Sequence, residues 1–221
     1  MIPQNGGNTL RDIAEIYDAY APTYDLAYRQ MIHRVEDEII AALVADLYQP
    51  GMSVLDIGCG TGNMINAGMF EPNDYTGLDI SPQMIRRAQY KFPAHTFRQH
   101  DVTEGLVGAW DLITAVFGII NYISIEQWVK IITQNLHPDG DWLAVMYSDG
   151  YKPGYINGEA FSYSLRDVES ALVGVGMPYE VYGLSFPFLG DEDASFDQML
   201  EQQWTLSQCS TSNCRYWVWV G

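Results

Sequence analysis

Ser53-Val54-Leu55-Asp56-Ile57-Gly58-Cys59-Gly60-Thr61-Gly62-Asn63 is the stretch that decides the fold of this chain. Its first half is apolar and predicts a buried strand. Alternating glycines follow, and residues 63–67 can be helical. Glycine allows a sharp turn at positive φ, and without a Cβ it lets a ligand approach the backbone closely. The stretch therefore predicts a strand, a tight turn and a helix N-terminus that can face a ligand.

An acidic residue follows at a distance that suits nucleoside binding. Residues 75–80 predict a second short strand in which Asp79 stands 21 positions after Gly58. A carboxylate at this spacing can bind both ribose hydroxyls of a nucleoside. The dinucleotide fingerprint G-x-G-x-x-G does not fit, because its third glycine would fall on Asn63. The pattern therefore favours a nucleoside that is not a dinucleotide.

The pattern from Asp56 to Gly62 is D-x-G-x-G-x-G, and it resembles motif I of the class I S-adenosylmethionine-dependent methyltransferases. Residues 17–25 resemble the "Y-D-x-x-A-x-x-Y-D" segment that precedes motif I in many small-molecule members, and residues 118–122 resemble their fourth motif. The resemblance covers roughly residues 17–221. It implies S-adenosyl-L-methionine as the cofactor and S-adenosyl-L-homocysteine as its product.

The resemblance also implies which residues bind the cofactor. In that family residues 17–25 form a lid on which Tyr24 would face the methionine end, although three tyrosines at helical spacing can also simply pack on the sheet. Asp101 would accept from the adenine amino group, or it only forms a turn. The full set that we expect at the cofactor is Tyr24, Asp56, Gly58, Cys59, Gly60, Asp79, Ile80, Met84, Asp101, Val102 and Phe117.

The order of elements predicts an α/β fold. Two helices come first, residues 31–47 being the second, and strands then alternate with helices that Ser81, Ser124 and Ser164 can cap. Residues 110–117 form an apolar run typical of a central parallel strand. Residues 138–140 predict a turn before a fifth strand at 142–147, and sixth and last strands are expected at 179–185 and 214–220. We expect a seven-stranded, mostly parallel sheet with helices on both faces and an antiparallel last strand.

We interpret the 221 residues as a single methyltransferase domain. Residues 1–48 would be a helical lid, 49–150 the cofactor-binding core, and 151–221 the substrate-side loops and last strands. The loop at 148–163 would form a substrate wall, and residues 186–208, with acidic residues at 191–193, would be an excursion in solvent.

Charge and cysteine content bear on partners. The formal net charge is −17 with only 11 Lys and Arg, which argues against a nucleic acid and favours a neutral or cationic small-molecule acceptor. The three cysteines predict neither a disulfide framework nor a zinc site. The chain lacks a long apolar run and its start does not resemble a signal peptide, so we expect a cytoplasmic protein without a metal or a membrane span.

Candidate catalytic residues are sparse. His95 and His137 precede strands and are expected at the wrong edge of the sheet, whereas His100 ends a strand at the correct edge and His33 could reach the site from the early helix. Asn121 and Tyr122 lie in the segment that resembles the fourth motif. Two alternatives to a methyltransferase for N or O of a small molecule are an aminopropyl-type transferase and a non-catalytic module that binds the cofactor.

Overall fold

The computed structural model describes residues 10–27, 31–66, 70–149, 160–184, 207–208 and 216–221. The helices are α1 (Leu10–Tyr20), α2 (Tyr24–Ala27), α3 (Met31–Leu47), α4 (Asn63–Asn66), α5 (Pro82–Lys91), α6 (Ile125–Asn135) and α7 (Leu165–Val175), with two short 3-10 helices, η1 (Val102–Glu104) and η2 (Ile119–Asn121). The strands are β1 (Val54–Ile57), β2 (Tyr75–Asp79), β3 (Thr96–Gln99), β4 (Trp110–Val116), β5 (Leu136–Tyr147), β6 (Glu180–Leu184), β7 (Ser207–Gln208) and β8 (Tyr216–Val220).

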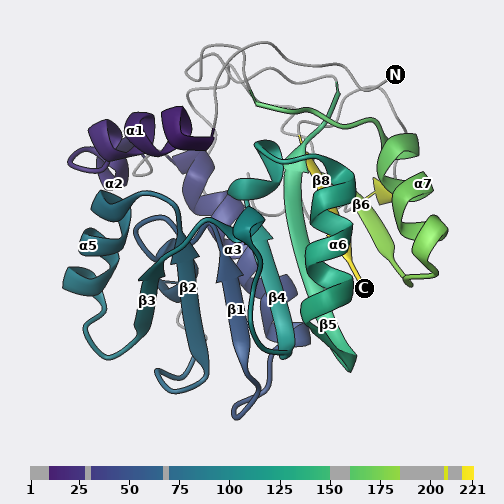
Figure 1. The fold of residues 1–221 in the computed structure, drawn as a ribbon, viewed down its shortest axis with the longest axis horizontal. Coiled ribbons are helices and arrows are strands. Elements are labelled where there is room, and N and C mark those ends of the chain that lie inside the picture. The colour runs from purple at the N-terminus through teal and green to yellow at the C-terminus, as the bar shows by residue number, and fades with distance from the viewer. Residues whose placement is uncertain (1–9, 28–30, 67–69, 150–159, 185–206, 209–215) are drawn as a thin grey trace.

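The strands form one sheet in the order β3-β2-β1-β4-β5-β8-β6-β7 (Figure 1). The pairs among β1 to β5 are parallel, and β8 is antiparallel to both neighbours, β5 and β6. The predicted mixed sheet with an antiparallel last strand is therefore confirmed. The structure adds the two-residue strand β7, which lies in the segment predicted as an excursion and pairs with β6.

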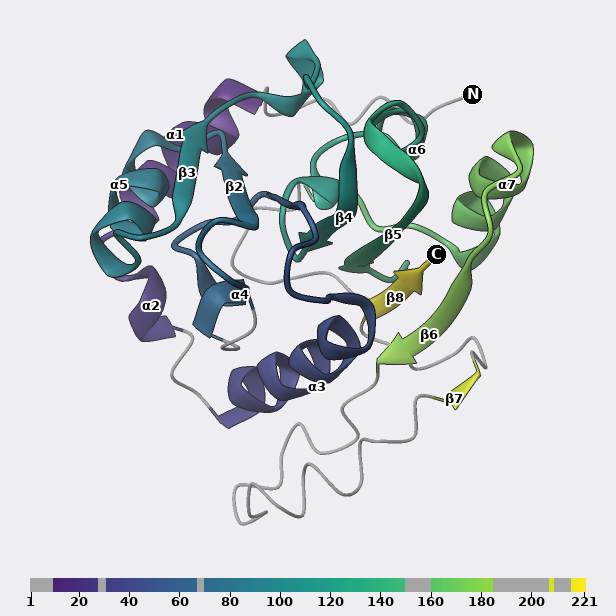
Figure 2. The same cartoon turned by 90° about the horizontal axis from the view of Figure 1, so that it is seen from below.

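Helices cover both faces of the sheet (Figure 2). One apolar core contains buried residues of α3, α4 and α5, among them Ile40, Met64 and Ile85, and it includes Tyr75 and Val145 of the sheet. The other core contains buried residues of α6 and α7. This layering confirms the predicted α/β architecture.

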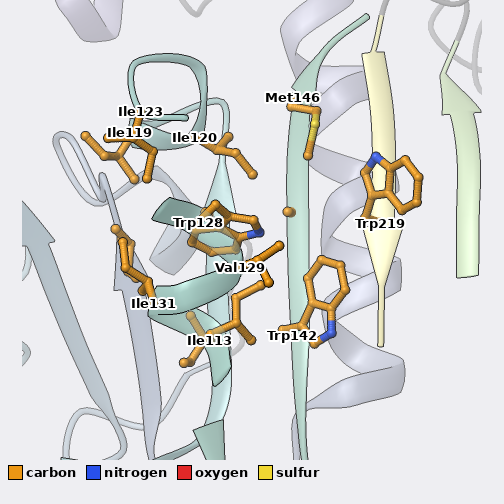
Figure 3. Close-up of a cluster of buried hydrophobic side chains, with 14 of the residues drawn as sticks. Ile113, Ile119, Ile120, Ile123, Trp128, Val129, Ile131, Trp142, Met146 and Trp219 are labelled. Carbon is orange, nitrogen blue, oxygen red and sulfur yellow. The ribbon is translucent and has the colours of Figure 1, made fainter. Parts of the chain in front are cut away.

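The α6 side is rich in tryptophan (Figure 3). Trp128 of α6, Trp142 of β5 and Trp219 of β8 are all almost fully buried, with Ile113 and Met146 beside them in the same core. Large aromatic side chains bury much apolar area each, so this core anchors the strands β4, β5 and β8 under α6.

Local signals decide where several helices begin and end. The Ser124 hydroxyl accepts from the backbone amide of Gln127, and the Gln127 side-chain oxygen accepts from the backbone amide of Ser124. These two bonds form a capping box at the predicted cap of α6. Ser164 caps α7, and Gly176 ends it at φ +71°. These boundaries agree with the sequence prediction because each depends on residues within one turn of the helix.

The turn predicted at residues 138–140 is wrong. β5 begins at Leu136, directly after α6, and runs through these residues. Leu136 pairs with Trp110 and Asp141 with Leu112, so the register shifts between the two pairs. A Cβ on Gly140 would lie 2.8 Å from the Asp111 carbonyl oxygen. Close pairing with β4 therefore overrides the local turn preference, and an irregular stretch of strand accommodates Pro138.

Candidate functional site

The site begins at the glycine turn after β1. Gly58, Gly60 and Gly62 have φ values of +76°, +54° and +83°. The Gly58 and Cys59 amides donate to the Leu78 carbonyl at 2.7 and 2.9 Å, which attaches the turn to the end of β2. A Cβ on Gly58 would lie 2.8 Å from the Ile119 backbone nitrogen. The turn therefore needs glycine both for its conformation and because the segment after β4 packs directly against it.

Asp79 at the end of β2 faces this turn. Its two carboxylate oxygens accept from the Gly60 amide at 2.9 Å and from the Ser81 amide at 2.8 Å. Burial raises the pKa of Asp79 to about 6, although these backbone amides act in the opposite direction. The carboxylate is thus held in place beside the glycine turn, where the spacing in the sequence predicts it.

Asp56 has a different environment. It is almost fully buried inside β1 and accepts from the Tyr75 hydroxyl at 2.7 Å and the Thr114 hydroxyl at 2.9 Å. Burial raises its pKa to about 6 against both hydrogen bonds, and the charge of Asp79 raises it further. Asp56 therefore joins β1 to its neighbours β2 and β4 below the turn.

A cavity opens at the carboxyl ends of β1, β2 and β4. This edge of an open α/β sheet is where ligands bind. The described residues that line it come from six parts of the chain: Ile13, Tyr17, Tyr24, Ile57, Gly58, Gly60, Leu78, Asp79, Ile80, Met84, His100, Asp101, Val102, Val116, Phe117, Gly118, Ile119 and Tyr122. Nine of the eleven residues predicted at the cofactor are in this set. We name it the first cavity.

A second cavity adjoins the first on the other side of the glycine turn. Its lining includes Asp37 and Ile40 of α3, Asn63 and Met64 of α4, and the predicted residues Asp56 and Cys59. Five residues line both cavities: Tyr24, Gly58, Gly60, Val116 and Phe117. The glycine turn therefore separates two adjoining cavities, and their linings together include all eleven predicted residues.

A group of three tyrosines, Tyr17, Tyr24 and Tyr122, lines the first cavity. The hydroxyls of Tyr17 and Tyr122 lie 2.8 Å apart, and the Tyr17 ring meets the Tyr24 and Tyr122 rings edge-on with centroids 6.3 and 6.0 Å apart. Figure 1 shows α1 and α2 at the edge toward which β1, β2 and β3 point. Of the three tyrosines in the predicted lid segment, Tyr17 and Tyr24 line the cavity, whereas Tyr20 is exposed.

Phe117 is the one non-glycine residue with a positive φ, +53°, in the described parts of the chain. It follows β4 directly, its amide donates to the Val145 carbonyl, and its ring packs edge-on against Tyr216 with centroids 4.6 Å apart. A strained backbone at a cavity wall is common at functional sites. This conformation, with Gly118 next to it, lets the chain turn over Gly58.

Asp101 and Val102 follow β3 and line the first cavity. Asp101 caps η1, and its Oδ1 accepts from the Thr103 amide and the Thr103 hydroxyl at 2.9 and 2.6 Å. Asp101 thus forms the turn that its residue type favours, and it also lines the cavity.

The four candidate catalytic residues separate in the structure. Tyr122 and His100 line the first cavity, and His100 Nε2 lies 2.7 Å from the Gly105 carbonyl oxygen. Asn121 is fully buried, its Oδ1 accepts from the Tyr147 amide, and it is not among the described residues that line either cavity. Asn121 therefore has a structural role here. His33 belongs to α3, but its side chain lies outside the described residues.

Several lining residues were not predicted from the sequence. Ile13, Tyr17 and Asp37 come from the N-terminal helices, and Asn63 opens α4. The tyrosine spacing in residues 17–25 was the signal available for Tyr17. No local pattern marks Asp37, because its place depends on how α3 packs beside the glycine turn.

Other expectations concern parts of the chain that are not described. The predicted substrate wall at 148–163 and the excursion at 186–208 fall mostly outside the described residues, as do Cys209 and Cys214. Cys59 is a buried free thiol whose pKa is raised well above its usual value by burial. In the described ranges, no three or more His, Cys, Asp or Glu side chains gather so as to hold a metal ion. None of the helices described is long and apolar enough to cross a membrane.

Residues 54–140 match the family model of a methyltransferase domain. This segment contains the glycine turn, Asp79, Asp101 and Phe117. The core of the chain is therefore similar to a methyltransferase domain. The resemblance to the class I S-adenosylmethionine-dependent methyltransferases is thereby confirmed.

The proteins that are similar to this chain include methyltransferases that act on different kinds of acceptor atom. The chain is 27% identical over 145 residues to a dTDP-amino-sugar N,N-dimethyltransferase of Streptomyces venezuelae, covering 60% of this chain and 61% of that protein. It is 28% identical over 148 residues to a ubiquinone/menaquinone C-methyltransferase of Geotalea daltonii, covering 62% and 63%. The fold matches magnesium protoporphyrin IX methyltransferase of Synechocystis, solved with S-adenosylhomocysteine, with a TM-score of 0.64 at 16% identity, covering 96% of this chain and 99% of that one.

The chain spans only part of the curated relatives that it matches. For three of them the shared region is 32%, 61% and 49% of the relative's length. The similarity therefore concerns the methyltransferase domain and does not identify the methyl acceptor.

Proposed function

We propose that this protein is an S-adenosyl-L-methionine-dependent methyltransferase that transfers a methyl group to N or O of a small molecule. The observation that carries the proposal is the contact of Asp79 with the amide of Gly60, a residue that lines both adjoining cavities. This arrangement places a carboxylate for a sugar next to a backbone that has no Cβ. The residues therefore fit the nucleoside part of such a cofactor.

The adenosine part would occupy the first cavity. Asp79 would accept from the two ribose hydroxyls, and Ile80 and Met84 would pack against the base. Both bonds from Thr103 reach Oδ1 of Asp101, so Oδ2 would accept from the adenine amino group while the Val102 amide serves a ring nitrogen. Charge-assisted hydrogen bonds of this kind are stronger than neutral ones.

The methionine part would occupy the second cavity. Its ammonium group carries a positive charge, and Asp37 and Asp56 bring two carboxyl groups to the lining of that cavity. Tyr24 and Phe117 line both cavities and would flank the junction where the sulfur lies. The cofactor supplies a methyl group made electrophilic by its positively charged sulfur.

The residues of the chain would act on the reaction mainly by positioning. Tyr17, Tyr24 and Tyr122 would exclude water from the methyl group and hold the acceptor in line with the bond that breaks. An amine acceptor must reach this place uncharged, and a hydroxyl acceptor must lose its proton. The net charge of −17 supports a neutral or cationic acceptor. The curated relatives include N- and C-methyltransferases, so the acceptor atom needs a direct test.

The remaining expectations form part of this proposal. Residues 1–48 would be the lid, 49–150 the core and 151–221 the acceptor side of a single domain. A cytoplasmic location and the absence of a nucleic-acid or membrane partner stay predictions.

Calorimetry with S-adenosylmethionine and S-adenosylhomocysteine tests the proposal. We expect both to bind, and a panel of amines, phenols and carbon acids should then contain a methylated product. Binding of neither at millimolar concentration would refute the cofactor assignment. Binding without turnover on the whole panel would favour the non-catalytic alternative, and transfer of an aminopropyl group would favour the other.

Replacing Asp79 with Ala tests the site itself. We expect S-adenosylhomocysteine binding to weaken by about 2–3 kcal/mol, or roughly 30- to 150-fold, because a charge-assisted pair of hydrogen bonds is lost. The control is Asp111→Ala, which removes a carboxylate that accepts from the Ser53 amide and hydroxyl, both at 2.7 Å, at the opposite edge of the sheet. That variant should lose stability and keep its affinity. Equal affinity in Asp79→Ala and the wild type would show that the ribose assignment is wrong.

A further inference from the structure

Asp25, in the short helix α2, contacts parts of the chain that are far away in sequence. Its Oδ1 accepts from the Thr61 hydroxyl at 2.6 Å and from Lys91 Nζ at 3.1 Å, and its Oδ2 accepts from Arg87 Nη2 at 3.3 Å. Thr61 belongs to the glycine turn, and Arg87 and Lys91 belong to α5. One carboxylate therefore joins the N-terminal segment to the turn and to the helix that follows β2.

These contacts form a closed group instead of a single surface pair. Lys91 Nζ also donates to the Thr61 hydroxyl at 3.1 Å and to Asn63 Oδ1 at 3.4 Å. The side chains of Asp25 and Lys91 are only 26% and 23% exposed, and Thr61 is fully buried. Networks that are partly shielded from water are screened less than isolated surface pairs.

An exposed pair on α1 shows the difference. Arg11 and Glu15 approach to 3.7 Å with side chains that are 88% and 71% exposed. Pairs of this kind contribute little to stability. The contacts of the Asp25 group are shorter than this pair, and their side chains are more buried. They involve four parts of the chain, namely α2, the glycine turn, α4 and α5.

The electrostatics keep this group ionised near neutral pH. Burial acts to raise the pKa of Asp25, but the hydrogen bonds from Thr61 and Lys91, together with the charge of Lys91, outweigh it and hold the pKa below its usual value.

The immediate neighbours of this group line the cavities. Tyr24 precedes Asp25 and lines both cavities, and Gly60 precedes Thr61 and donates its amide to Asp79. A Cβ on Gly60 would lie 3.9 Å from the Tyr24 ring. Fixing Asp25 against Thr61 therefore fixes the spacing between Tyr24 and the glycine turn, across the junction of the two cavities.

We propose that Asp25 is a positioning residue whose contacts with Thr61 and Lys91 hold Tyr24 over the glycine turn and thereby set how fast the cofactor and its product leave. This inference rests on the proposed function, because it concerns release from the same site. It assigns to α2 a role in the exchange of the cofactor that is separate from contact with it.

A second anchor explains why loss of Asp25 should loosen α2 without releasing the whole segment. Asp18 of α1 accepts from the Ser81 hydroxyl at 2.5 Å and from the Gln83 amide at 3.0 Å, at the start of α5. The hydroxyls of Tyr17 and Tyr122 add a third contact. With these in place, α1 stays on the core and the change is confined to the Tyr24 side.

The test compares cofactor release in matched variants of the full chain. Asp25→Asn, Lys91→Met and the double variant are studied with S-adenosylhomocysteine, by calorimetry for Kd and by stopped-flow displacement for the dissociation rate. We expect each single variant to release the product about 10-fold faster, the size of effect of one charged hydrogen bond. The double variant should be no faster than the singles, because all three break one group of contacts.

Glu15→Gln is the control. It removes one negative charge from the same N-terminal segment at an exposed side chain, so its release rate should stay within about twofold of the wild type. The thermal midpoint without ligand is measured for every variant, and a merely structural role of Asp25 would lower it while leaving the release rate of the folded protein unchanged. Lys91→Met carries the test if Asp25→Asn does not fold.

The outcomes separate this inference from the proposed function. Wild-type release rates in both Asp25→Asn and Lys91→Met, or additive effects in the double variant, overturn the role of Asp25 and leave the methyltransferase proposal intact. Failure of the wild-type protein to bind S-adenosylhomocysteine overturns both.

Discussion

The glycine turn and the N-terminal segment border the same two cavities but are held in place in different ways. The turn is fixed by backbone conformation, with three glycines at positive φ and amides bonded to the end of β2. The segment α1–α2 is fixed by side chains, chiefly Asp18 and Asp25, that reach partners more than 35 residues away. One wall of the site is therefore a local property of the chain, and the other is a tertiary one.

The carboxyl groups of the two regions differ in the direction in which their pKa is shifted. Burial raises the pKa of Asp56 and of Asp79 to about 6 beside the turn, and the charge of a neighbouring carboxylate, Asp79 or Asp18 respectively, raises each pKa further. Asp25 is also desolvated, but hydrogen bonds from Thr61 and Lys91 hold its pKa below the usual value. Charge is thus costly at the turn in the free protein and stabilising at the N-terminal segment. A cofactor that donates hydrogen bonds to Asp79 would offset part of that cost.

The largest expected effect comes from Gly58→Ala, which attacks the backbone wall. The new Cβ would lie 2.8 Å from the Ile119 nitrogen and 3.0 Å from Gly118 Cα at a φ of +76°. Left-handed strain and overpacking together should cost roughly 2–5 kcal/mol. Urea unfolding and calorimetry with S-adenosylhomocysteine should show losses in both stability and affinity.

Gly51→Ala is the matched control for that variant. Gly51 has a φ of +96°, and a Cβ there would meet nothing within 4 Å. It should lose stability through strain alone and keep its affinity. If Gly58→Ala behaves like Gly51→Ala, packing of the turn against residues 118–119 does not shape the site.

The second effect is a pH dependence that separates the two regions. Because the folded pKa values of Asp56 and Asp79 lie above the unfolded value of about 3.9, the folded state binds more protons between pH 4 and 6. The free energy of unfolding should therefore rise by about 2 kcal/mol as the pH falls from 7 to 5. Cofactor affinity should fall over the same range, because protonated Asp79 is a weaker acceptor. Asp25, with its lowered pKa, stays ionised there and loses its contribution only at lower pH.

Asp79→Asn supplies the reference for that measurement. Protonation also relieves the net charge of −17 in the same direction, so the informative quantity is the difference between wild type and variant. Urea unfolding and calorimetry at pH 7 and pH 5 should both show a smaller change in Asp79→Asn. Identical pH dependence in the two proteins would contradict a raised pKa at Asp79.

The smallest effect is expected from Ser81→Ala, which acts on the anchor of α1. Ser81 caps α5 through the Met84 amide and donates to Asp18, whereas Ser124 caps α6 far from the segment. Ser124→Ala should cost about 1 kcal/mol and Ser81→Ala about 1–2 kcal/mol. Thermal unfolding measures both. Only Ser81→Ala should also speed cofactor release. Equal release rates in the two variants would show that the contact of Asp18 with Ser81 does not affect release.

Much of the fold could be predicted because its signals are short. The capping residues of α5, α6 and α7 lie within one turn of the bonds that they make. The apolar run of β4 predicted a central strand, and its pairing with β1 and β5 agrees. The turn at residues 138–140 was wrong because pairing with β4, a contact distant in sequence, outweighs the local preference of Pro, Asp and Gly.

The candidate site divides in the same way. Gly58, Gly60 and Asp79 could be found from spacing, because parallel strands bring their carboxyl ends to one edge. Asn121 was misjudged, since its type and position do not reveal that its side chain bonds to the Tyr147 amide. Asp37 and Tyr17 reach the lining from helices whose packing no local pattern encodes.

The sequence by itself determined the order of the elements, the glycine turn and the acid that faces it, since backbone conformation and strand alternation depend on neighbouring residues. Only the tertiary structure decided that Asp25 meets Thr61 and Lys91, that Tyr17 meets Tyr122, and that Asp56 is buried between two hydroxyls. The physical reason is that a side-chain hydrogen bond or ion pair has no periodicity along the chain. It forms where packing brings two groups within about 3 Å in a partly dry place.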